Sequence, residues 1–563
     1  MSGAMPMRYK FSGQKLFQGA EIPSIYFQGS TLFQPVADRF GIELDQINFL
    51  ICELFGIIIG TLLRLYLPAE KKKNHNYRLL VCGLGGVVTA LFCFGLRSLY
   101  LWAITTVCYA ISYFSLPKYS HLIVFVTAVG YLSYLHIYRM VNDYGGYSLD
   151  ITMPMMVIVQ KITAYAFAIH DGGKERERPG QLRIPEQARH AIKSTPDYWV
   201  FCSYVFSFQS LLCGPFCFFD EYMDFIQGRS VNPSSYKKNE DIKSVPKADG
   251  TAAGSEEEEL LPPPQFHPSP LWPVTRKVLT AAALCYLHIT LVAAVPLELL
   301  TDDAVVSKLS FFQLMFYILI ATTFIRLKYY LAWLLSDAVA NASGLGFNGY
   351  DELGKARWDL VSNVDIIEVE FAYNLRGCLA AWNSCTARWL RYVAYDRAVV
   401  VPMVATYSLS AFWHGFYPGY YVTFLSGALF TEAARWGRRV FRPPFQKWRS
   451  TQILYDFITF FCTRIVLSYT TFPFVLLELR YAWNIYKALY FWLHIVAVLA
   501  VVGLPYFWKK PRRDTKKADG EVTAYRLDKA GQEDGALPSD KKPSDVAGGA
   551  RKDAQFAEKP ATG

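Results

Sequence analysis

Charge is scarce in this chain of 563 residues. Only 18% of the residues are Asp, Glu, Lys or Arg, whereas soluble domains carry about 25%. The charged residues are also segregated into a few polar stretches, and long apolar runs between them are nearly bare. This distribution excludes a soluble protein with one large core. Together with 52% hydrophobic residues, it predicts a polytopic membrane protein.

Metal-ligand spacing is also missing. The eleven cysteines are scattered, mostly inside apolar runs, and the pair Cys213 and Cys217 lies among apolar and aromatic residues. We therefore interpret the cysteines as small hydrophobic residues, and we expect no metal and no cofactor. No internal repeat of fixed period is visible, which argues against the inverted repeats of many transporters.

Continuous apolar runs define the fold class. A spanning helix needs about 20 mostly apolar residues, and a β-barrel would instead need alternating strands. We therefore predict an all-α bundle of about eleven transmembrane helices that encloses a substrate chamber, with re-entrant or interfacial helices. The predicted spans, of which Val399–Phe412 is too short to cross alone, are Ile47–Leu67, Leu79–Leu96, Leu99–Leu116, His121–Met140, Ile151–Ile169, Tyr198–Phe219, Val278–Leu299, Leu309–Leu335, Val399–Phe412, Tyr417–Ala434, Ile453–Leu476 and Ile485–Phe507.

Three polar stretches lie outside the predicted bundle of residues 46–508. Residues 1–45 form a polar N-terminal segment, residues 227–270 a flexible loop, and residues 509–563 a disordered tail, because the last two lack the apolar content to fold alone. The net charge of +10 does not indicate nucleic acid. Many basic groups lie at helix ends, as in Lys71–Lys73, where they mark cytosolic flanks and favour anionic membrane lipids.

One histidine lies in an apolar, aromatic run. His414 is part of Ser408–Tyr421, and an ionisable group at membrane depth is costly enough to be a functional candidate. It could instead be a buried histidine bonded to Ser410, one turn earlier. Gly415, Pro418 and Gly419 follow, so we expect the helix to break here, which membrane proteins tolerate only beside a cavity or inside protein. Neutral imidazole is also the usual acceptor of an alcohol proton.

Asn383 is the polar residue that could act with His414. An intramembrane Asn often bonds across helices, but its amide can also donate to a developing oxyanion. One straight helix would separate Asn383 and His414 by roughly 46 Å, so they can meet only if the chain turns between them. Residues Tyr395–Arg397 and Pro402 offer that turn.

Several other polar residues have two interpretations. Arg376, Arg388, Arg391 and Arg397 could be ordinary helix-end charges or could recognise phosphate. Gln160, Lys161 and Thr163 could be packing polarity or could line a tunnel. Ser343–Asp365 is predicted to be a compact loop or a short amphipathic helix at the membrane interface. His170 and Asp171 are adjacent, which disfavours a catalytic pair.

The chain resembles the membrane-bound O-acyltransferase family, and within it the lysophospholipid acyltransferases. The resemblance extends over about Thr31–Phe507, and the loop of residues 227–270 and the tail depart from it. It lies closest to the branch that uses lysophosphatidylethanolamine, lysophosphatidylserine or lysophosphatidylcholine. The residues that carry it are Pro35–Phe49, Met153–Thr163, His170–Gly172, Gly214–Pro215, Gly344–Asp351, Ala356–Asn363, Trp382–Asn383, Trp389–Tyr392 and Trp413–Tyr421.

This resemblance implies a reaction and a place for it. The family's catalytic histidine and asparagine correspond to His414 and Asn383, acyl-CoA is the expected donor, a lysophospholipid the expected acceptor, and the endoplasmic reticulum membrane the expected location. The candidate substrate-binding residues are Trp382, Arg388, Trp389, Arg391, Trp413 and Tyr417. The alternatives are an acyltransferase for a sterol, diacylglycerol or protein, and a lipid transporter that performs no chemistry. Oligomeric state stays open.

Overall fold

The computed structural model describes residues 28–116, 118–146, 148–229, 268–351 and 353–507. The chain divides into two units, Met1–Tyr506 and Phe507–Gly563, and the description that follows concerns the first. Within the described residues the regular elements are helices, and β-pairing is limited to isolated bridges. The predicted loop falls largely outside these residues and the predicted tail wholly so, so both stay predictions.

The all-α fold is confirmed. In chain order the elements are α1 (Gln34–Phe40), α2 (Leu44–Tyr66), η2 (Lys72–Asn74), α3 (His75–Phe94), η3 (Gly95–Ser98), α4 (Leu99–Phe114), α5 (Ser120–Asn142), α6 (Thr152–Glu177), α7 (Pro185–Arg189), α8 (Tyr198–Val205), α9 (Phe219–Gln227), α11 (Leu271–Ala294), η5 (Leu297–Thr301), α12 (Asp303–Lys308), α13 (Phe311–Ser343), α14 (Ile366–Phe371), α15 (Leu375–Ala381), α16 (Ser384–Leu390), the π-helical turn η6 (Arg391–Tyr395), α17 (Pro402–His414), α18 (Pro418–Phe445), α19 (Arg449–Leu476), α20 (Leu479–Ala488) and α21 (Trp492–Phe507).

The predicted count of about eleven spans is not confirmed. In the part of the chain that the structure describes, seven helices are long and apolar enough to cross a membrane, or eight if α20 and α21 together form one broken span. One of the seven runs from Lys72 to Phe114 and joins two predicted spans. α20 and α21 are bent by 82° against each other, so the predicted continuous span Ile485–Phe507 is wrong.

The predicted span Tyr198–Phe219 is also wrong. Only α8, eight residues long, forms there, and residues 206–218 follow as irregular but largely buried backbone. Pro215 cannot continue a helix because it has no N–H. The buried Lys161 of α6 compensates in part: its Nζ donates to the carbonyls of Tyr204 (2.7 Å) and Val205 (3.3 Å) and to Ser207 Oγ (2.9 Å). The buried amine of Lys161 is therefore satisfied by structural hydrogen bonds, as its packing interpretation requires.

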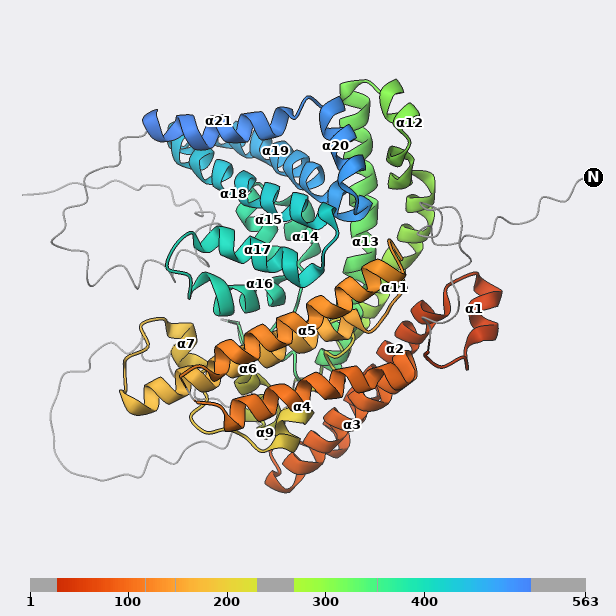
Figure 1. The fold of residues 1–563 in the computed structure, drawn as a ribbon, viewed down its shortest axis with the longest axis vertical. Helices are drawn as coiled ribbons and strands as arrows, with labels where there is room; N and C mark the ends of the chain where they lie inside the picture. The colour runs from red at the N-terminus through yellow and green to blue at the C-terminus, as the bar shows by residue number, and fades with distance from the viewer. Residues whose placement is uncertain (1–27, 117, 147, 230–267, 352, 508–563) are drawn as a thin grey trace, which may run out of the picture. The chain divides into compact units, whose positions relative to one another are not determined.

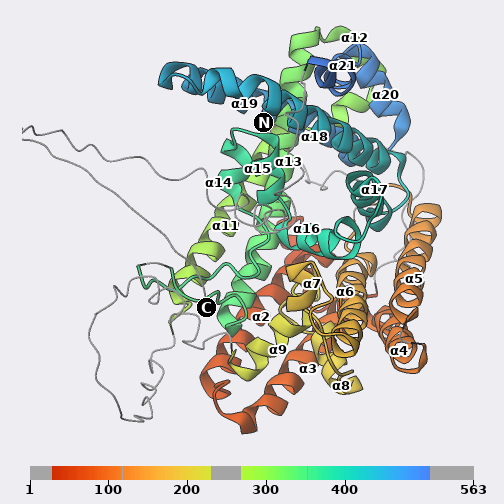
Figure 2. The ribbon, with the colours of Figure 1, turned by 90° about the vertical axis from the view of Figure 1, so that its left-hand side faces the viewer.

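Two apolar cores make up the bundle. One core joins residues of α2–α6, α8 and α9 with residues of α13, α16, η6 and α17, and the other joins residues of α12, α13, α15 and α18–α21. In both views α16 and α17 lie between α5 and α6 on one side and α18 on the other, while the long helix α13 extends along both groups (Figures 1 and 2). α16 packs on α6, and α17 packs on α5 and α18. The segment that carries the candidate residues is thus held from both sides.

All eleven cysteines are free thiols, and eight of them are buried, including Cys217 and Cys385. This burial is what the interpretation as small hydrophobic residues predicts.

Candidate active site

His414 is the last residue of α17, and the predicted helix break follows it directly. α17 ends at His414, α18 begins at Pro418, and Gly415 adopts φ = 122°, a conformation that side chains with a Cβ rarely take. We call Trp413–Gly419 the His414 turn. α17 has 13 residues and is about 20 Å long, shorter than the roughly 30 Å of a bilayer's hydrocarbon. The expectation that this helix would not cross alone fits that length.

The hydrogen bond of His414 fixes its tautomer. Its Nδ1 lies 2.8 Å from the carbonyl oxygen of Ser410. A carbonyl can only accept, so Nδ1 carries the proton, and in neutral imidazole Nε2 then carries the lone pair. Aromatic rings surround the imidazole, with Phe424 and Phe474 at 4.8 and 5.2 Å between ring centroids. The geometry therefore presents Nε2 as a proton acceptor within an apolar setting.

Neighbouring helices hold the His414 turn through uncharged hydrogen bonds. Trp413 Nε1 donates to the carbonyl of Met156 on α6 (2.9 Å), and Gly419 N donates to the carbonyl of Leu477 after α19 (2.7 Å). Tyr417 Oη accepts from the backbone N–H of Gly145, in the loop after α5 (3.0 Å). Trp413 and Tyr417 thus support the turn.

Asn383 stands immediately before α16, in a left-handed backbone conformation (φ = 49°, ψ = 46°) that Asn tolerates better than most residues. Asn363 takes over the capping: its carbonyl accepts from Ser384 N (2.9 Å) and its Oδ1 from Cys385 N (3.0 Å). The Asn383 side chain makes no cap, and its Oδ1 is buried with no hydrogen-bond partner among the described residues. Such an atom is costly unless a ligand or water completes it.

The chain turns between Asn383 and His414 as predicted. η6 follows α16, and α17 starts at Pro402. The rings of Trp389 and Trp413 lie 5.7 Å apart, so the end of α16 contacts the end of α17. Asn383 precedes Trp389 by about 9 Å along the α16 axis. Within the described residues, the link between the two candidates runs through this tryptophan pair, with no direct hydrogen bond.

Trp389 itself is fully buried, and its Nε1 donates to Thr163 Oγ1 on α6 (2.9 Å). Gln160, one turn earlier on α6, donates to Thr386 Oγ1 (3.0 Å). Both α6 side chains therefore hold α16 in place through hydrogen bonds between the helices. These bonds explain why polar residues occur at these positions of α6.

Trp382 is held from the other side. Its ring lies against Tyr330 and Trp333 of α13, at 5.7 and 5.0 Å between centroids. Tyr330 Oη donates to Glu370 (2.6 Å), which also pairs with Arg326 of α13 and with Arg464 of α19. This largely buried charge cluster holds α14 through Glu370, and Arg464 also donates to Cys378 Sγ of α15 (3.5 Å), so both elements that lead into Trp382 and Asn383 are held.

The arginines separate into different environments. Arg388 is paired with Glu221 of α9, and Arg397 with the buried Asp171, which also accepts from Tyr392. The side chain of Arg391 is 50% exposed beside Asp396, and Arg376 is exposed on α15. Asp171 is therefore an ion-pair partner, while His170 stacks on His121 at 3.7 Å.

A pocket, which we call the arginine pocket, is lined by Glu186, Phe218, Arg388, Arg391, Tyr392 and Asp396.

A histidine that the sequence did not single out borders the arginine pocket. His190 is buried, and its Nδ1 lies 2.8 Å from Asp220 and its Nε2 3.2 Å from Glu186. Burial alone lowers the pKa of His190, but the hydrogen bonds to Asp220 and Glu186 outweigh it, so the pKa lies above its ordinary value. Through these hydrogen bonds His190 links α7 to α9.

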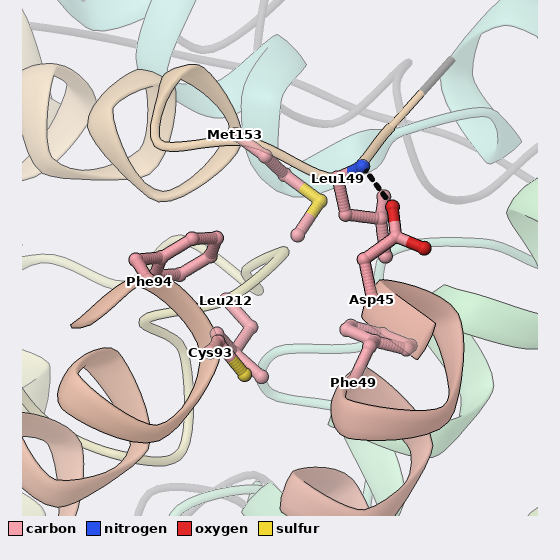
Figure 3. Close-up of a pocket in the computed structure, with 7 residues that line it drawn as sticks. All are labelled: Asp45, Phe49, Cys93, Phe94, Leu149, Met153 and Leu212. Carbon is pink, nitrogen blue, oxygen red and sulfur yellow. Dashed lines mark hydrogen bonds between the residues drawn. The ribbon is translucent and has the colours of Figure 1, made fainter. Parts of the chain in front are cut away.

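A second, smaller pocket lies elsewhere in the bundle and includes none of the predicted site residues. Asp45 at the start of α2 accepts there from the backbone N–H of Leu149 (2.5 Å), as Figure 3 shows. Mostly apolar side chains fill the rest of the wall, which is lined by Asp45, Phe49, Cys93, Phe94, Leu149, Met153 and Leu212.

Sequence reasoning missed Asn363, Glu221 and His136, whose Nε2 lies 3.1 Å from the carbonyl of Trp413. A signal existed only for His136, a titratable residue inside the predicted span His121–Met140. The described residues of Ser343–Asp365, which include Asn363, form a loop after the end of α13, with one bridge inside it, between Tyr350 and Ala356, and another from Val364 to Trp382. The first of its two predicted forms, a loop, is therefore correct.

The sequence is similar to those of known proteins over most of its length. The profile of the membrane-bound O-acyltransferase family matches residues 137–472. The chain is 38% identical over 504 residues to lysophospholipid acyltransferase 6 of Drosophila melanogaster, covering 88% of this chain and 66% of that protein. It is 37% identical over 494 residues to membrane-bound glycerophospholipid O-acyltransferase 2 of Rattus norvegicus, covering 88% and 91%. A Saccharomyces cerevisiae lysophospholipid acyltransferase is 29% identical, with 83% and 75% covered. The chain belongs to the membrane-bound O-acyltransferase family.

Proposed function

We propose that this protein is an acyl-CoA:lysophospholipid O-acyltransferase. The observation that carries the proposal is the His414 turn, where Nδ1 is engaged by Ser410 and the lone pair of Nε2 is left for a proton. The names of relatives that align over most of the chain support a lysophospholipid as the acceptor. Lysophosphatidylethanolamine, lysophosphatidylserine and lysophosphatidylcholine are the acceptors that we would test first.

The proposed reaction is direct acyl transfer. His414 Nε2 takes the proton of the free glycerol hydroxyl while the oxygen attacks the thioester carbonyl carbon of acyl-CoA. The N–H groups of the Asn383 amide stabilise the oxyanion that develops on the carbonyl oxygen. The C–S bond then breaks, CoA leaves as thiolate, and the imidazolium returns the proton to give free CoA thiol. Neither a cofactor nor a metal takes part in this scheme.

The donor is proposed to enter through the arginine pocket. Guanidinium groups suit phosphate, and Arg391, half exposed, can rotate toward the phosphates of CoA. Arg388 is engaged by Glu221 and would contribute a fixed charge. Trp382, Trp389, Trp413 and Tyr417 would shape the wall between the pocket and His414, with Trp389 acting through packing because it is fully buried.

Release of free CoA separates an acyltransferase from a transporter. Purified protein mixed with acyl-CoA and lysophospholipid should produce CoA thiol and the diacyl phospholipid in equal amounts. His414→Ala should lose at least about 1000-fold of the turnover, since both proton transfer and alignment are removed. A folded His414→Ala protein with near-normal turnover would refute the mechanism, and lipid movement without CoA release would favour the transporter.

A panel of acceptors separates the remaining alternatives. Lysophospholipids, a sterol and diacylglycerol would be compared with one acyl-CoA by mass spectrometry. We expect the lysophospholipids to be acylated at the highest kcat/KM. Preferential acylation of a sterol or diacylglycerol would overturn the proposed acceptor while leaving the roles of His414 and Asn383 intact.

The endoplasmic reticulum membrane is the proposed location. The seven or eight candidate spans and the family support a multi-pass membrane protein. Imaging of the tagged full chain beside markers of several membranes tests the compartment, and steady-state residence in another membrane would contradict it.

A further inference from the structure

His136 lies on α5 and contacts the backbone that carries His414. It is buried, and its Nε2 lies 3.1 Å from the carbonyl oxygen of Trp413. Since that oxygen can only accept, Nε2 of His136 carries the proton and donates. A buried histidine inside a spanning helix is costly, so this contact requires an explanation beyond filling space.

The Trp413 carbonyl, which accepts this hydrogen bond, lies in the last turn of α17. In a continuing helix, Trp413 O would receive the N–H of Tyr417, and the next carbonyl would face Pro418, which has no N–H. The helix stops instead, and Gly415 N serves the carbonyls of Ala411 and Phe412. His136 supplies the missing donor for Trp413 where the apolar surroundings leave little water to do so.

The missing side chain at Gly415 makes room for the same ring. A Cβ at position 415 would lie 3.3 Å from atoms of the His136 imidazole, closer than ordinary contacts of that type. The backbone at Gly415, with φ = 122°, also disfavours any residue with a Cβ. The imidazole of His136 therefore contacts the His414 turn at two places, the carbonyl of Trp413 and the side-chain position of Gly415.

We propose that His136 is a positioning residue for His414, an inference that rests on the proposed function. The carbonyl of Trp413 and the backbone nitrogen of His414 belong to one planar peptide unit. A hydrogen bond to this carbonyl therefore fixes the peptide plane from which the rest of His414 extends. Ser410 fixes the rotation of the His414 ring, and His136 fixes the place of its backbone. Loss of the second constraint misplaces Nε2, and a shift of about 1 Å can cost roughly 100-fold in rate.

The test compares three purified full-length variants with the wild type. His136→Phe keeps a ring but loses the donor, and we expect kcat to fall about 30-fold with KM for both substrates within about twofold. His136→Gln places an amide N–H near the position of Nε2, and it should recover kcat to within about fivefold of the wild type. The matched control is His288→Phe, because His288 of α11 donates Nδ1 to the Phe324 carbonyl (3.1 Å), away from the His414 turn. It should keep the wild-type kcat.

The outcomes are distinguishable. Unchanged kcat in His136→Phe, no recovery in His136→Gln, or an equal fall in His288→Phe each overturns the positioning role. If His136→Phe fails to fold, His136→Asn replaces it: the shorter amide stays polar but cannot reach Trp413, and the same fall in kcat is expected. A wild type that releases no CoA would refute the proposed function itself. If the wild type releases CoA, His414→Ala is inactive and His136→Phe keeps the wild-type kcat, only the positioning role of His136 is refuted.

Discussion

Two parts of the α16–α17 region, the His414 turn and the arginine pocket, are held by different forces. Around the His414 turn, the contacts are uncharged: indole and imidazole N–H groups donate to backbone carbonyls. Around the arginine pocket, the contacts are ionic, as in Arg388 with Glu221 and His190 with Asp220. Neutral hydrogen bonds change little with salt or pH, whereas ion pairs respond to both. We therefore expect the geometry of the His414 turn to change little with salt and pH, and that of the arginine pocket to respond to both.

After His414→Ala, the largest expected effect is at Asn383, the proposed donor to the oxyanion. Asn383→Gly accepts the left-handed backbone without strain and removes the amide, so the protein should fold while kcat falls by roughly 10²–10³-fold, as for other lost oxyanion donors. Steady-state kinetics with acyl-CoA and lysophospholipid measure it. Asn383→Asp, which keeps the shape and loses the N–H donors, should fall similarly. Near-normal turnover in both would remove Asn383 from the site.

Arg388→Ala should show that the pocket end depends on charge pairing. It leaves the carboxylate of Glu221, 4% exposed, without its cation. We expect a loss of roughly 2 kcal/mol in stability, less than the 3–5 kcal/mol of fully buried pairs because the Arg388 side chain is 33% exposed. Thermal unfolding in detergent measures the change. The double variant with Glu221→Gln should regain part of the loss; if it is no more stable than Arg388→Ala, the pairing explanation is wrong.

Arg391→Ala should have a smaller effect and should spare stability. Its side chain is half exposed beside Asp396, and exposed pairs contribute little. We expect KM for acyl-CoA to rise about three- to fivefold with kcat unchanged, and the difference from the wild type to shrink at high salt. Arg376→Ala, an exposed arginine on α15, is the matched control. A change in kcat without a change in KM would place Arg391 outside donor binding.

The smallest effect concerns pH at His190. Because its folded pKa is raised, the folded state binds the proton more tightly than the unfolded state. The stabilisation is complete below the unfolded pKa of about 6.5 and is lost as pH rises through the folded value. The wild type should therefore exceed His190→Gln in melting temperature by a few degrees at low pH, with a narrowing gap as pH rises. A gap that is constant with pH would contradict the ionic link.

The fold class and the helix break after His414 were predictable because their signals are local. Apolar runs identify helices, and His414 with the following glycines and proline identifies a helix break. The roles of Asn363 and Glu221 were not predictable, because each depends on a partner distant in the chain: Asn363 caps α16, and Glu221 of α9 meets Arg388. The span count failed for a related reason. Residues 206–218 are apolar enough for a helix, but they form irregular backbone. Lys161 of α6 donates to the last carbonyls of α8 and to Ser207 Oγ, and these distant partners could not be read from the apolar run.

The absence of a side chain at Gly415 also has an evolutionary consequence. Positions 136 and 415 share one space, so an alanine at 415 would require a smaller residue at 136 in addition to a changed backbone conformation, and the donor to Trp413 would then be lost. The two positions are expected to change together or not at all. Among related chains, a histidine aligned with His414 would then be a weaker sign of an active enzyme than that histidine accompanied by this intact pair.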